Sequence, residues 1–188
     1  MLWDLGLDQL DDIQIVKKKI EEIENNFDLV MIVEKFEESL ILMKDELCWE
    51  TSDITSLKLN GRIEDVKIQL NDSTRSLLAD YMKSDYLLYN HFLNIIKNKI
   101  ELFGKMRMED ELSALSAANS EISQQCLHTP SDKLVGDPRK SWGGIGLLGY
   151  DAGNKTNEEC TRMVERERNY VGRLQNIQKE KLKSGDLD

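Results

Sequence analysis

The stretch that decides the fold runs from Phe27 to Arg62 and reads FDLVMIVEKFEESLILMKDELCWETSDITSLKLNGR. It opens with a short apolar run, residues 27–33, whose length and Val and Ile content favour a buried strand. A helical pattern follows, closed by Cys48-Trp49. Because a strand that runs directly into a helix is typical of α/β proteins, we predict an α/β fold. The apolar positions of the helical pattern recur at spacings of four, three and four residues: Phe36, Leu40, Met43 and Leu47.

Outside this stretch the chain is predicted to be predominantly helical. Apolar residues recur every three or four positions in several segments, which predicts amphipathic helices. Asp72-Ser73-Thr74 supplies N-cap residues before the longest pattern, and Lys83-Ser84-Asp85 interrupts that pattern with a fresh cap. The helical patterns cover residues 10–23, 72–103 with the break at 83–85, 109–126, and a final helix after the cap residues 154–157.

A loop-rich segment lies between the last two helical patterns. Both prolines and six of the eleven glycines fall within residues 127–153, so we assign residues 127–157 to loops, with a candidate second strand at 146–150. Gly144 to Gly149 matches the G-x-G-x-x-G spacing of nucleotide-binding turns. That motif needs a preceding strand and a following helix, and neither is predicted here, so a loop is favoured. Residues 1–183 form part of one domain, and residues 184–188 a frayed tail.

The composition excludes several classes of function. A formal net charge of −10 argues against nucleic acid as a partner, although 25 basic residues leave room for a local cationic pocket. No run of 18 apolar residues spans a membrane, and no signal peptide opens the chain. The three cysteines form no CxxC pair and the two histidines have no metal-ligand spacing, so no metal is expected. In an oxidising compartment one cysteine pair could form a disulfide; in the cytosol all three would remain thiols.

Several charged side chains are candidates for chemistry, each with a structural alternative. Lys58 and Arg62 flank a Leu-Asn-Gly turn and could contact an anionic ligand, or could simply be solvated charges. His91 follows Asp85-Tyr-Leu-Leu-Tyr-Asn and could be catalytic, or could be satisfied beside the core. Glu34, Glu37 and Glu38 suit the positive end of the helix that they begin, or one of them could face a pocket at the end of the predicted strand.

Two acceptor triplets for N-glycosylation are present. They are Asn71-Asp-Ser73 and Asn154-Lys-Thr156. Each lies beside a predicted helix start or loop, and therefore at the surface where a glycan can be attached. Because such triplets also arise by chance, they indicate a secretory context only together with other signals.

The motifs taken together resemble the galactose 3-O-sulfotransferase family, over about residues 1–180. The likeness is strongest over residues 27–60, where several specific residues fall in the family's order. The motifs that carry it are Asp4-Leu-Gly-Leu-Asp8, Phe36-Glu-Glu-Ser-Leu40, Leu47-Cys-Trp49, Lys58-Leu-Asn60 with Arg62, Leu88-Tyr-Asn-His-Phe92, Leu148-Gly-Tyr150, Cys160 and the Glu167 to Tyr170 helix.

The resemblance implies a Golgi membrane enzyme with a luminal catalytic domain. Such an enzyme transfers sulfate from 3'-phosphoadenosine 5'-phosphosulfate (PAPS) to the 3-hydroxyl of galactose on a glycolipid, such as galactosylceramide, or on a glycan. On this basis Lys58 and Arg62 are expected to approach the donor, and His91 to lie on the acceptor side. Cys126 and Cys160 flank the loop-rich segment, so a disulfide between them is expected under oxidising conditions.

The chain also departs from the family pattern. We find no membrane anchor, no Lys-Thr-rich phosphate loop after an opening strand, and no Arg-Asp-Pro segment for the 3'-phosphate. The chain is therefore expected to be the C-terminal part of a P-loop-like sulfotransferase domain, inactive without the N-terminal half, which would be its partner and carry the anchor. The alternatives are a non-enzymatic helical interaction module and a truncated, inactive homologue.

Overall fold

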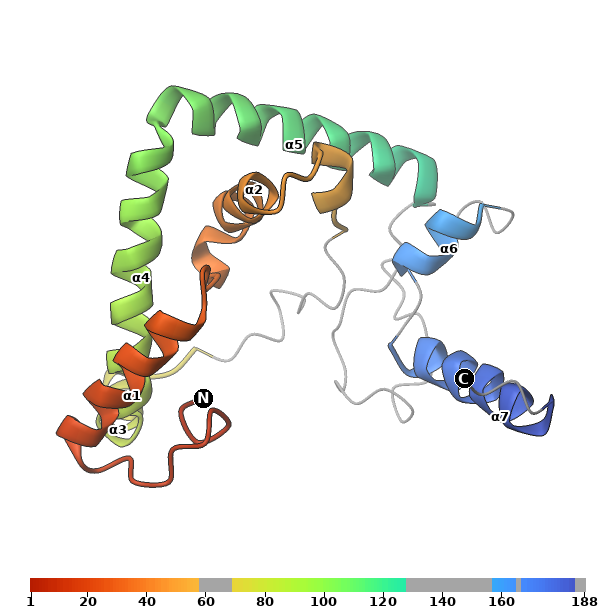
Figure 1. The fold of residues 1–188 in the computed structure, drawn as a ribbon. Coiled ribbons are helices and arrows are strands. Elements are labelled where there is room, and N and C mark those ends of the chain that lie inside the picture. Colours follow the sequence, from red (N-terminus) through yellow and green to blue (C-terminus); the bar gives the residue numbers. More distant parts are fainter. Residues whose placement is uncertain (58–68, 128–156, 165–166, 185–188) are drawn as a thin grey trace. The chain divides into compact units, whose positions relative to one another are not determined.

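The computed structural model describes residues 1–57, 69–127, 157–164 and 167–184, and it is mostly helical (Figure 1). The described residues fall into two compact units. The first comprises residues 1–55 and 69–118, and the second comprises residues 56–57, 119–127, 157–164 and 167–184. The elements in chain order are α1 (Ile13–Asn26), the 3-10 turns η1 (Val33–Lys35) and η2 (Thr51–Ile54) on either side of α2 (Phe36–Glu46), α3 (Asp72–Tyr81), α4 (Lys83–Phe103), α5 (Lys105–Cys126), α6 (Glu158–Val164) and α7 (Glu167–Ser184).

Local signals account for where the helices begin and end. The Asp12 side chain caps α1 by accepting hydrogen bonds from the backbone N–H groups of Gln14 and Ile15, at 2.9 and 3.3 Å. Asn71 caps α3 in the same way. Helix α4 ends at Gly104, whose φ of 96° is costly for residues with a Cβ atom. The break near residue 83 is confirmed, and the described residues contain the predicted helices, with the final one present as α6 and α7. The predicted caps are corrected: the cap of α3 is Asn71, just before residues 72–74, and no side chain caps α4, because Ser84 donates its hydroxyl hydrogen to the carbonyl of Leu10.

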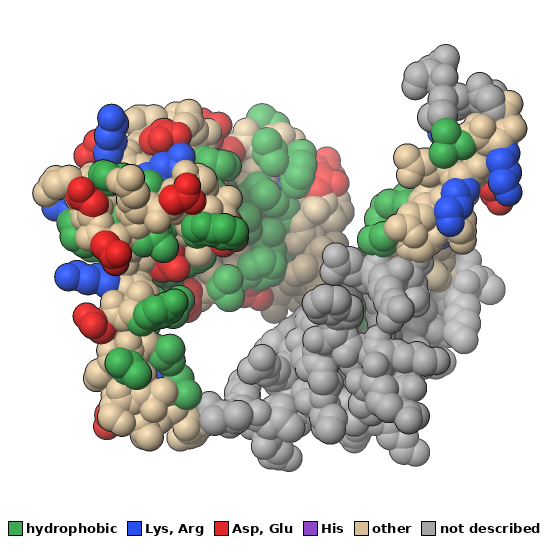
Figure 2. Space-filling model, turned by 90° about the horizontal axis from the view of Figure 1, so that it is seen from below, with side chains coloured by type: hydrophobic (Ala, Val, Ile, Leu, Met, Phe, Trp, Pro, Cys, Tyr) green, Lys and Arg blue, Asp and Glu red, His purple; other side chains and the backbone are tan. Residues whose placement is uncertain are grey.

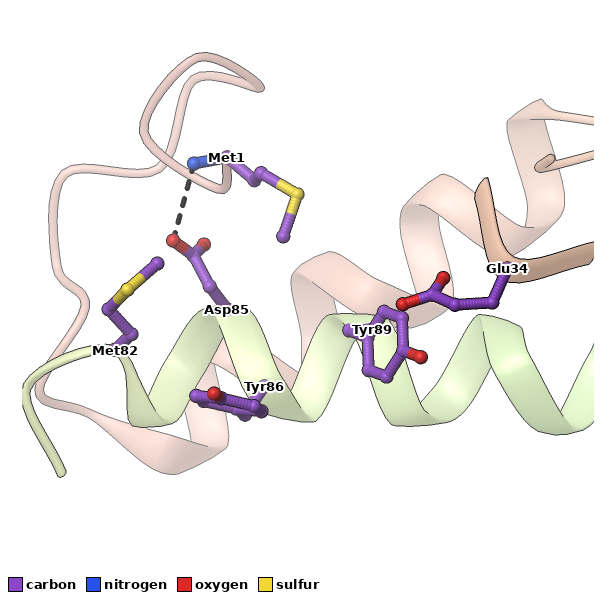
Figure 3. Close-up of a pocket in the computed structure, with 6 residues that line it drawn as sticks. All are labelled: Met1, Glu34, Met82, Asp85, Tyr86 and Tyr89. Carbon is purple, nitrogen blue, oxygen red and sulfur yellow. Dashed lines mark hydrogen bonds and ion pairs between the residues drawn. The ribbon is translucent and has the colours of Figure 1, made fainter. Parts of the chain in front are cut away.

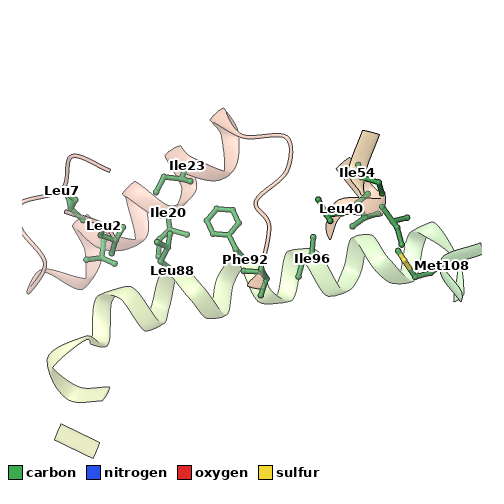
Figure 4. Close-up of a cluster of buried hydrophobic side chains, with 14 of the residues drawn as sticks. Leu2, Leu7, Ile20, Ile23, Leu40, Ile54, Leu88, Phe92, Ile96 and Met108 are labelled. Atoms are coloured by element: carbon green, nitrogen blue, oxygen red, sulfur yellow. The ribbon is translucent and has the colours of Figure 1, made fainter. Parts of the chain in front are cut away.

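Helix α4 organises the core of the first unit, because α1, α2 and α3 all pack against it. Its buried face presents Leu88, Phe92 and Ile96 at spacings of four residues (Figure 4). Two ion pairs between helices add to this packing. Lys44 of α2 pairs with Glu111 of α5, and Nζ of Lys99 on α4 lies 3.3 Å from Oε1 of Glu46 on α2. The buried residues that meet this face include Val16, Ile20 and Ile23 of α1, Leu40, Ile41 and Leu42 of α2, and Leu2, Leu7 and Ile54.

The predicted strand at residues 27–33 is not formed. Residues 27–32 make an extended connection between α1 and α2, and Val33 already belongs to the turn η1. The physical reason is that a strand requires a partner, and the part of the chain that the structure describes contains no strand. The candidate strand at 146–150 lies outside the described residues. The prediction of a predominantly helical chain is confirmed, while the P-loop-like fold remains a prediction.

Candidate functional site

A pocket of about 340 Å³ opens on the first unit (Figure 3). Segments far apart in the chain build it: the start of the chain, the turn η1, and the first turns of α4 with the residue that precedes them. Its lining combines two carboxylates, two phenol rings and two thioethers. The lining residues are Met1, Glu34, Met82, Asp85, Tyr86 and Tyr89.

Asp85 holds the start of the chain against α4. Its Oδ2 lies 3.3 Å from the amino nitrogen of Met1, and its Oδ1 accepts a hydrogen bond from the backbone N–H of Leu2 at 3.0 Å. The Leu2 side chain is fully buried beside the apolar face of α4. One of the two pocket carboxylates is therefore already engaged by the protein itself.

Glu34 and Tyr89 form the other polar side of the pocket. The Glu34 carboxylate lies beside the Tyr89 ring in Figure 3. Partial burial raises the pKa of the Tyr89 phenol, and the hydrogen bond and negative charge of Glu34 raise it further. Since the neutral phenol is favoured, Tyr89 keeps its proton as a hydrogen-bond donor, and Glu34 is an acceptor.

The chemistry of this pocket fits a ligand with hydroxyl groups. Carboxylate oxygens accept hydrogen bonds from hydroxyls, and the exposed ring of Tyr86 offers an apolar face. The Asp85 charge is paired with the Met1 amino group, whereas the negative charge of Glu34 disfavours an anionic sulfate donor such as PAPS. A second hollow, of about 450 Å³, runs along α6. Its named lining residues all come from that one helix, and Arg162 there is already paired with Glu158 at 2.6 Å.

Three of the residues singled out in the sequence lie outside the described part of the structure: Lys58, Arg62 and Asn154. Their assignments stay predictions. The segments on either side of Lys58 and Arg62 are described, and they show η2 before them and the N-cap of α3 after them.

His91 lies on α4 and pairs with α1. Its Nε2 is 2.7 Å from Oε2 of Glu24, and its ring meets Phe92 edge to face. Because residues two apart on a helix point in nearly opposite directions, His91 and Tyr89 cannot share one face, and His91 does not line the pocket. The role of His91 on the acceptor side stays a prediction. Its pairing with Glu24 is by itself a sufficient structural role for this side chain.

Asn71 is exposed at the start of α3. Its Oδ1 accepts hydrogen bonds from the backbone N–H of Thr74 and from the Ser73 hydroxyl, both at 2.8 Å. The capping role uses the side-chain oxygen of Asn71, and its amide nitrogen, where a glycan would be attached, makes no hydrogen bond within the described residues.

Cys126 and Cys160 are joined by a disulfide that links the end of α5 to α6, with a sequence separation of 34 residues. Both side chains are buried, whereas Cys48 is an exposed free thiol. Asn157 supports this junction by capping α6, since its side chain accepts hydrogen bonds from the backbone of Glu159 and Cys160. No group of three or more metal-ligating side chains occurs within the described residues, and none of the described helices is long and apolar enough to cross a bilayer.

Sequence reasoning missed the pocket as a unit. In the sequence-based predictions Asp85 has a role only in a helix cap and Tyr89 only in the motif Leu88-Tyr-Asn-His-Phe92. The signal available was the spacing of Asp85, Tyr86 and Tyr89, which brings all three near one side of a helix. The sequence leaves Glu34, Glu37 and Glu38 as equal candidates for a pocket, because the partners of Glu34 on α4 lie about fifty residues away and no local pattern reveals them.

Comparison with known proteins gives a consistent result. A family model described as galactose-3-O-sulfotransferase matches residues 1–178. Galactosylceramide sulfotransferase from Homo sapiens is 33% identical over 184 residues, covering 91% of this chain and 44% of the relative. Galactose-3-O-sulfotransferase 2 from Homo sapiens is 29% identical over 192 residues, covering 95% of this chain and 48% of the relative.

The chain therefore spans less than half of the length of these curated relatives, and the matched part is their C-terminal part. The bovine galactosylceramide sulfotransferase matches in the same way, with 32% identity over 184 residues. No solved structure matches the chain.

Proposed function

The chain belongs to the galactose-3-O-sulfotransferase family, and we propose that it serves the transfer of sulfate from PAPS to the 3-hydroxyl of a galactose residue. The acceptor is a galactose-terminated glycolipid, such as galactosylceramide, or a glycan. The observation that carries the proposal is the family match over residues 1–178, together with 33% identity to a galactosylceramide sulfotransferase.

The reaction sets clear requirements on the protein. The galactose oxygen attacks sulfur, its proton passes to a base, and the bond between sulfur and the donor's phosphate oxygen breaks. Cationic groups are needed around the sulfuryl oxygens and the departing phosphate. Lys58 and Arg62 are our candidates for contact with the donor. We assign the carboxylate-lined pocket to the acceptor side, because the charge of Glu34 disfavours the donor.

We also infer that the reaction takes place on the luminal side of the Golgi membrane. Two features of the chain support this location. A disulfide such as Cys126–Cys160 is typical of oxidising compartments, and Asn71 presents an acceptor triplet at the surface.

The proposal is tested with a chimera in which this chain replaces the matched C-terminal part of the human galactosylceramide sulfotransferase. Labelled PAPS is supplied with galactosylceramide, with lactose, or with an acceptor whose galactose lacks the 3-hydroxyl. We expect transfer to at least one of the first two acceptors and none to the third. The human parent enzyme is the control. If the parent is active and a folded chimera transfers no sulfate, the proposal is overturned.

The donor contacts are tested in the same chimera by Lys58→Ala and Arg62→Ala. Each lost charge-assisted contact with a phosphate should raise the KM for PAPS by about tenfold, and leave the KM for the acceptor nearly unchanged. Lys179→Ala, on the exposed C-terminal helix α7, is the matched charge control. Unchanged donor affinity in both variants would remove these residues from the donor site.

A further inference from the structure

The pocket of the first unit carries its negative charge unevenly. The Asp85 carboxylate is paired with the Met1 amino group at 3.3 Å. Glu34 makes no ion pair within the described residues, and the cation next to it in the sequence, Lys35, is already paired with Glu38 at 2.9 Å. One uncompensated negative charge therefore lies on the side of the pocket that η1 provides.

The facing wall of the pocket is a platform on α4. Tyr86 and Tyr89 are three residues apart, so their rings lie near one side of the helix. Figure 3 shows both rings between Met82 and Glu34. Tyr86 is 45% exposed, which leaves its ring open to a ligand. Because α4 is also the helix that organises the core, this platform is held rigidly.

An open aromatic ring beside an acceptor carboxylate suits a sugar. The C–H groups on one face of a pyranose pack against an aromatic ring, and the hydroxyls at its rim donate hydrogen bonds to a carboxylate. The volume of about 340 Å³ lies at the small end of the range of about 300–1,000 Å³ that is typical of ligand pockets. Figure 2 shows hydrophobic and acidic side chains interspersed on the surface of the first unit, which is the same combination on a larger scale.

We propose that this pocket distinguishes the acceptor from the product. It holds an uncharged galactose, with the ring of Tyr86 against the sugar face and the carboxylate of Glu34 accepting a hydrogen bond from a hydroxyl. Transfer replaces the hydrogen of one hydroxyl by a sulfuryl group, and the resulting ester is an anion. Repulsion between this anion and Glu34 weakens binding of the product and favours its release.

The test titrates the isotope-labelled chain with methyl β-galactoside and, separately, with its 3-sulfate. The backbone amide signals of Glu34 and of residues 82–89 are followed by NMR at physiological ionic strength. We expect the galactoside to shift these signals with a millimolar Kd, and the 3-sulfate to bind at least about fivefold more weakly. Absence of galactoside binding, or equal affinity for the two sugars, overturns the inference.

The inference takes the identity of the sugar from the proposed function, but the titration needs no sulfate transfer. A chimera that transfers sulfate while the chain binds no galactoside would overturn this inference alone. A chain that prefers the galactoside in this pocket, in a folded chimera that transfers no sulfate, would overturn the proposed function alone.

Two matched pairs of variants assign the effect to these side chains. Glu34→Gln should narrow the preference for the galactoside over its 3-sulfate to less than about twofold, whereas Glu37→Gln, exposed and outside the pocket, should leave the preference unchanged. Tyr86→Ala should weaken galactoside binding at least about fivefold. Tyr81→Ala, at a residue that is 88% exposed on α3, should change it by less than about twofold. Circular dichroism checks that all four variants keep their helical content. Equal effects within either pair contradict the inference.

Discussion

Tyr89 and Glu34 show at the scale of single residues how the pocket couples two distant segments. The phenol is on α4 and the carboxylate on the turn before α2, and Glu34 raises the pKa of the Tyr89 phenol only because the fold brings the two side chains together. The pKa of Tyr89 is raised by partial burial first and by Glu34 second. The pairing is therefore accessible to titration.

Glu34→Gln should lower the pKa of Tyr89 toward the ordinary tyrosine value of 10.0, because the negative charge that opposes tyrosinate is removed. Absorbance titration of tyrosinate measures the change, with Tyr89→Phe to assign the signal and the exposed Glu37→Gln as the control. In the wild-type chain, the raised pKa means that protonated Tyr89 adds to the free energy of unfolding. This contribution is fully present below pH 10.0 and is lost as the pH rises through the higher folded-state pKa. An unchanged Tyr89 titration in Glu34→Gln would contradict the coupling.

At the scale of elements, glycine has opposite effects on stability at a helix end and in a helix interior. Gly104 ends α4 with a φ of 96°, whereas Gly172 lies within α7 without a positive φ. Both positions have space for a Cβ atom, since no atom outside the local backbone lies within 4 Å of where it would be placed. Any effect of substitution should therefore come from backbone conformation alone.

Gly104→Ala should destabilise the first unit by about 1 kcal/mol, because alanine disfavours a left-handed φ. Gly172→Ala should instead stabilise α7 by up to about 1 kcal/mol, because alanine has the higher helix propensity. Urea unfolding followed by circular dichroism measures the first change, and the helical signal with residue-level exchange on α7 measures the second. Changes of the same sign in both variants would contradict the backbone assignment.

The disulfide acts at the scale of the whole molecule, because it joins segments of the second unit that are separated by 34 residues. Closing a loop of that length removes conformational entropy from the unfolded chain, worth about 4 kcal/mol in the chain-entropy description. The first unit contains neither of the two bonded cysteines. Reduction should therefore affect the two units differently.

Reduction, or the double change Cys126→Ser and Cys160→Ser, should loosen α6 and leave the core around α4 unchanged. Hydrogen exchange should show α6 amides accelerated and the amides of Leu88 to Ile96 unaffected. Alkylation without reductant should label one cysteine, Cys48, and alkylation after reduction should label all three. The variant Cys48→Ser, which leaves the disulfide intact, is the matched control. Labelling of Cys126 and Cys160 in oxidised material would refute the bond.

The sequence by itself determined the helices and the break before α4, as well as the family. Apolar spacing, Asp12, Asn71 and Gly104 act within one or two turns, so their signals survive in the sequence without a three-dimensional context. The family follows from motifs read in order along the chain.

Only the tertiary structure decided which distant residues meet. It joined Glu34 to Tyr89 and His91 to Glu24, and it left residues 27–32 as a connection outside any sheet and Val33 in the turn η1, where local composition alone predicts a strand. The physical reason is that apolar, β-branched composition sets the conformation that a segment prefers, whereas a strand exists only when a second strand satisfies its backbone hydrogen bonds. That partner is specified elsewhere in the fold and not by the seven residues themselves.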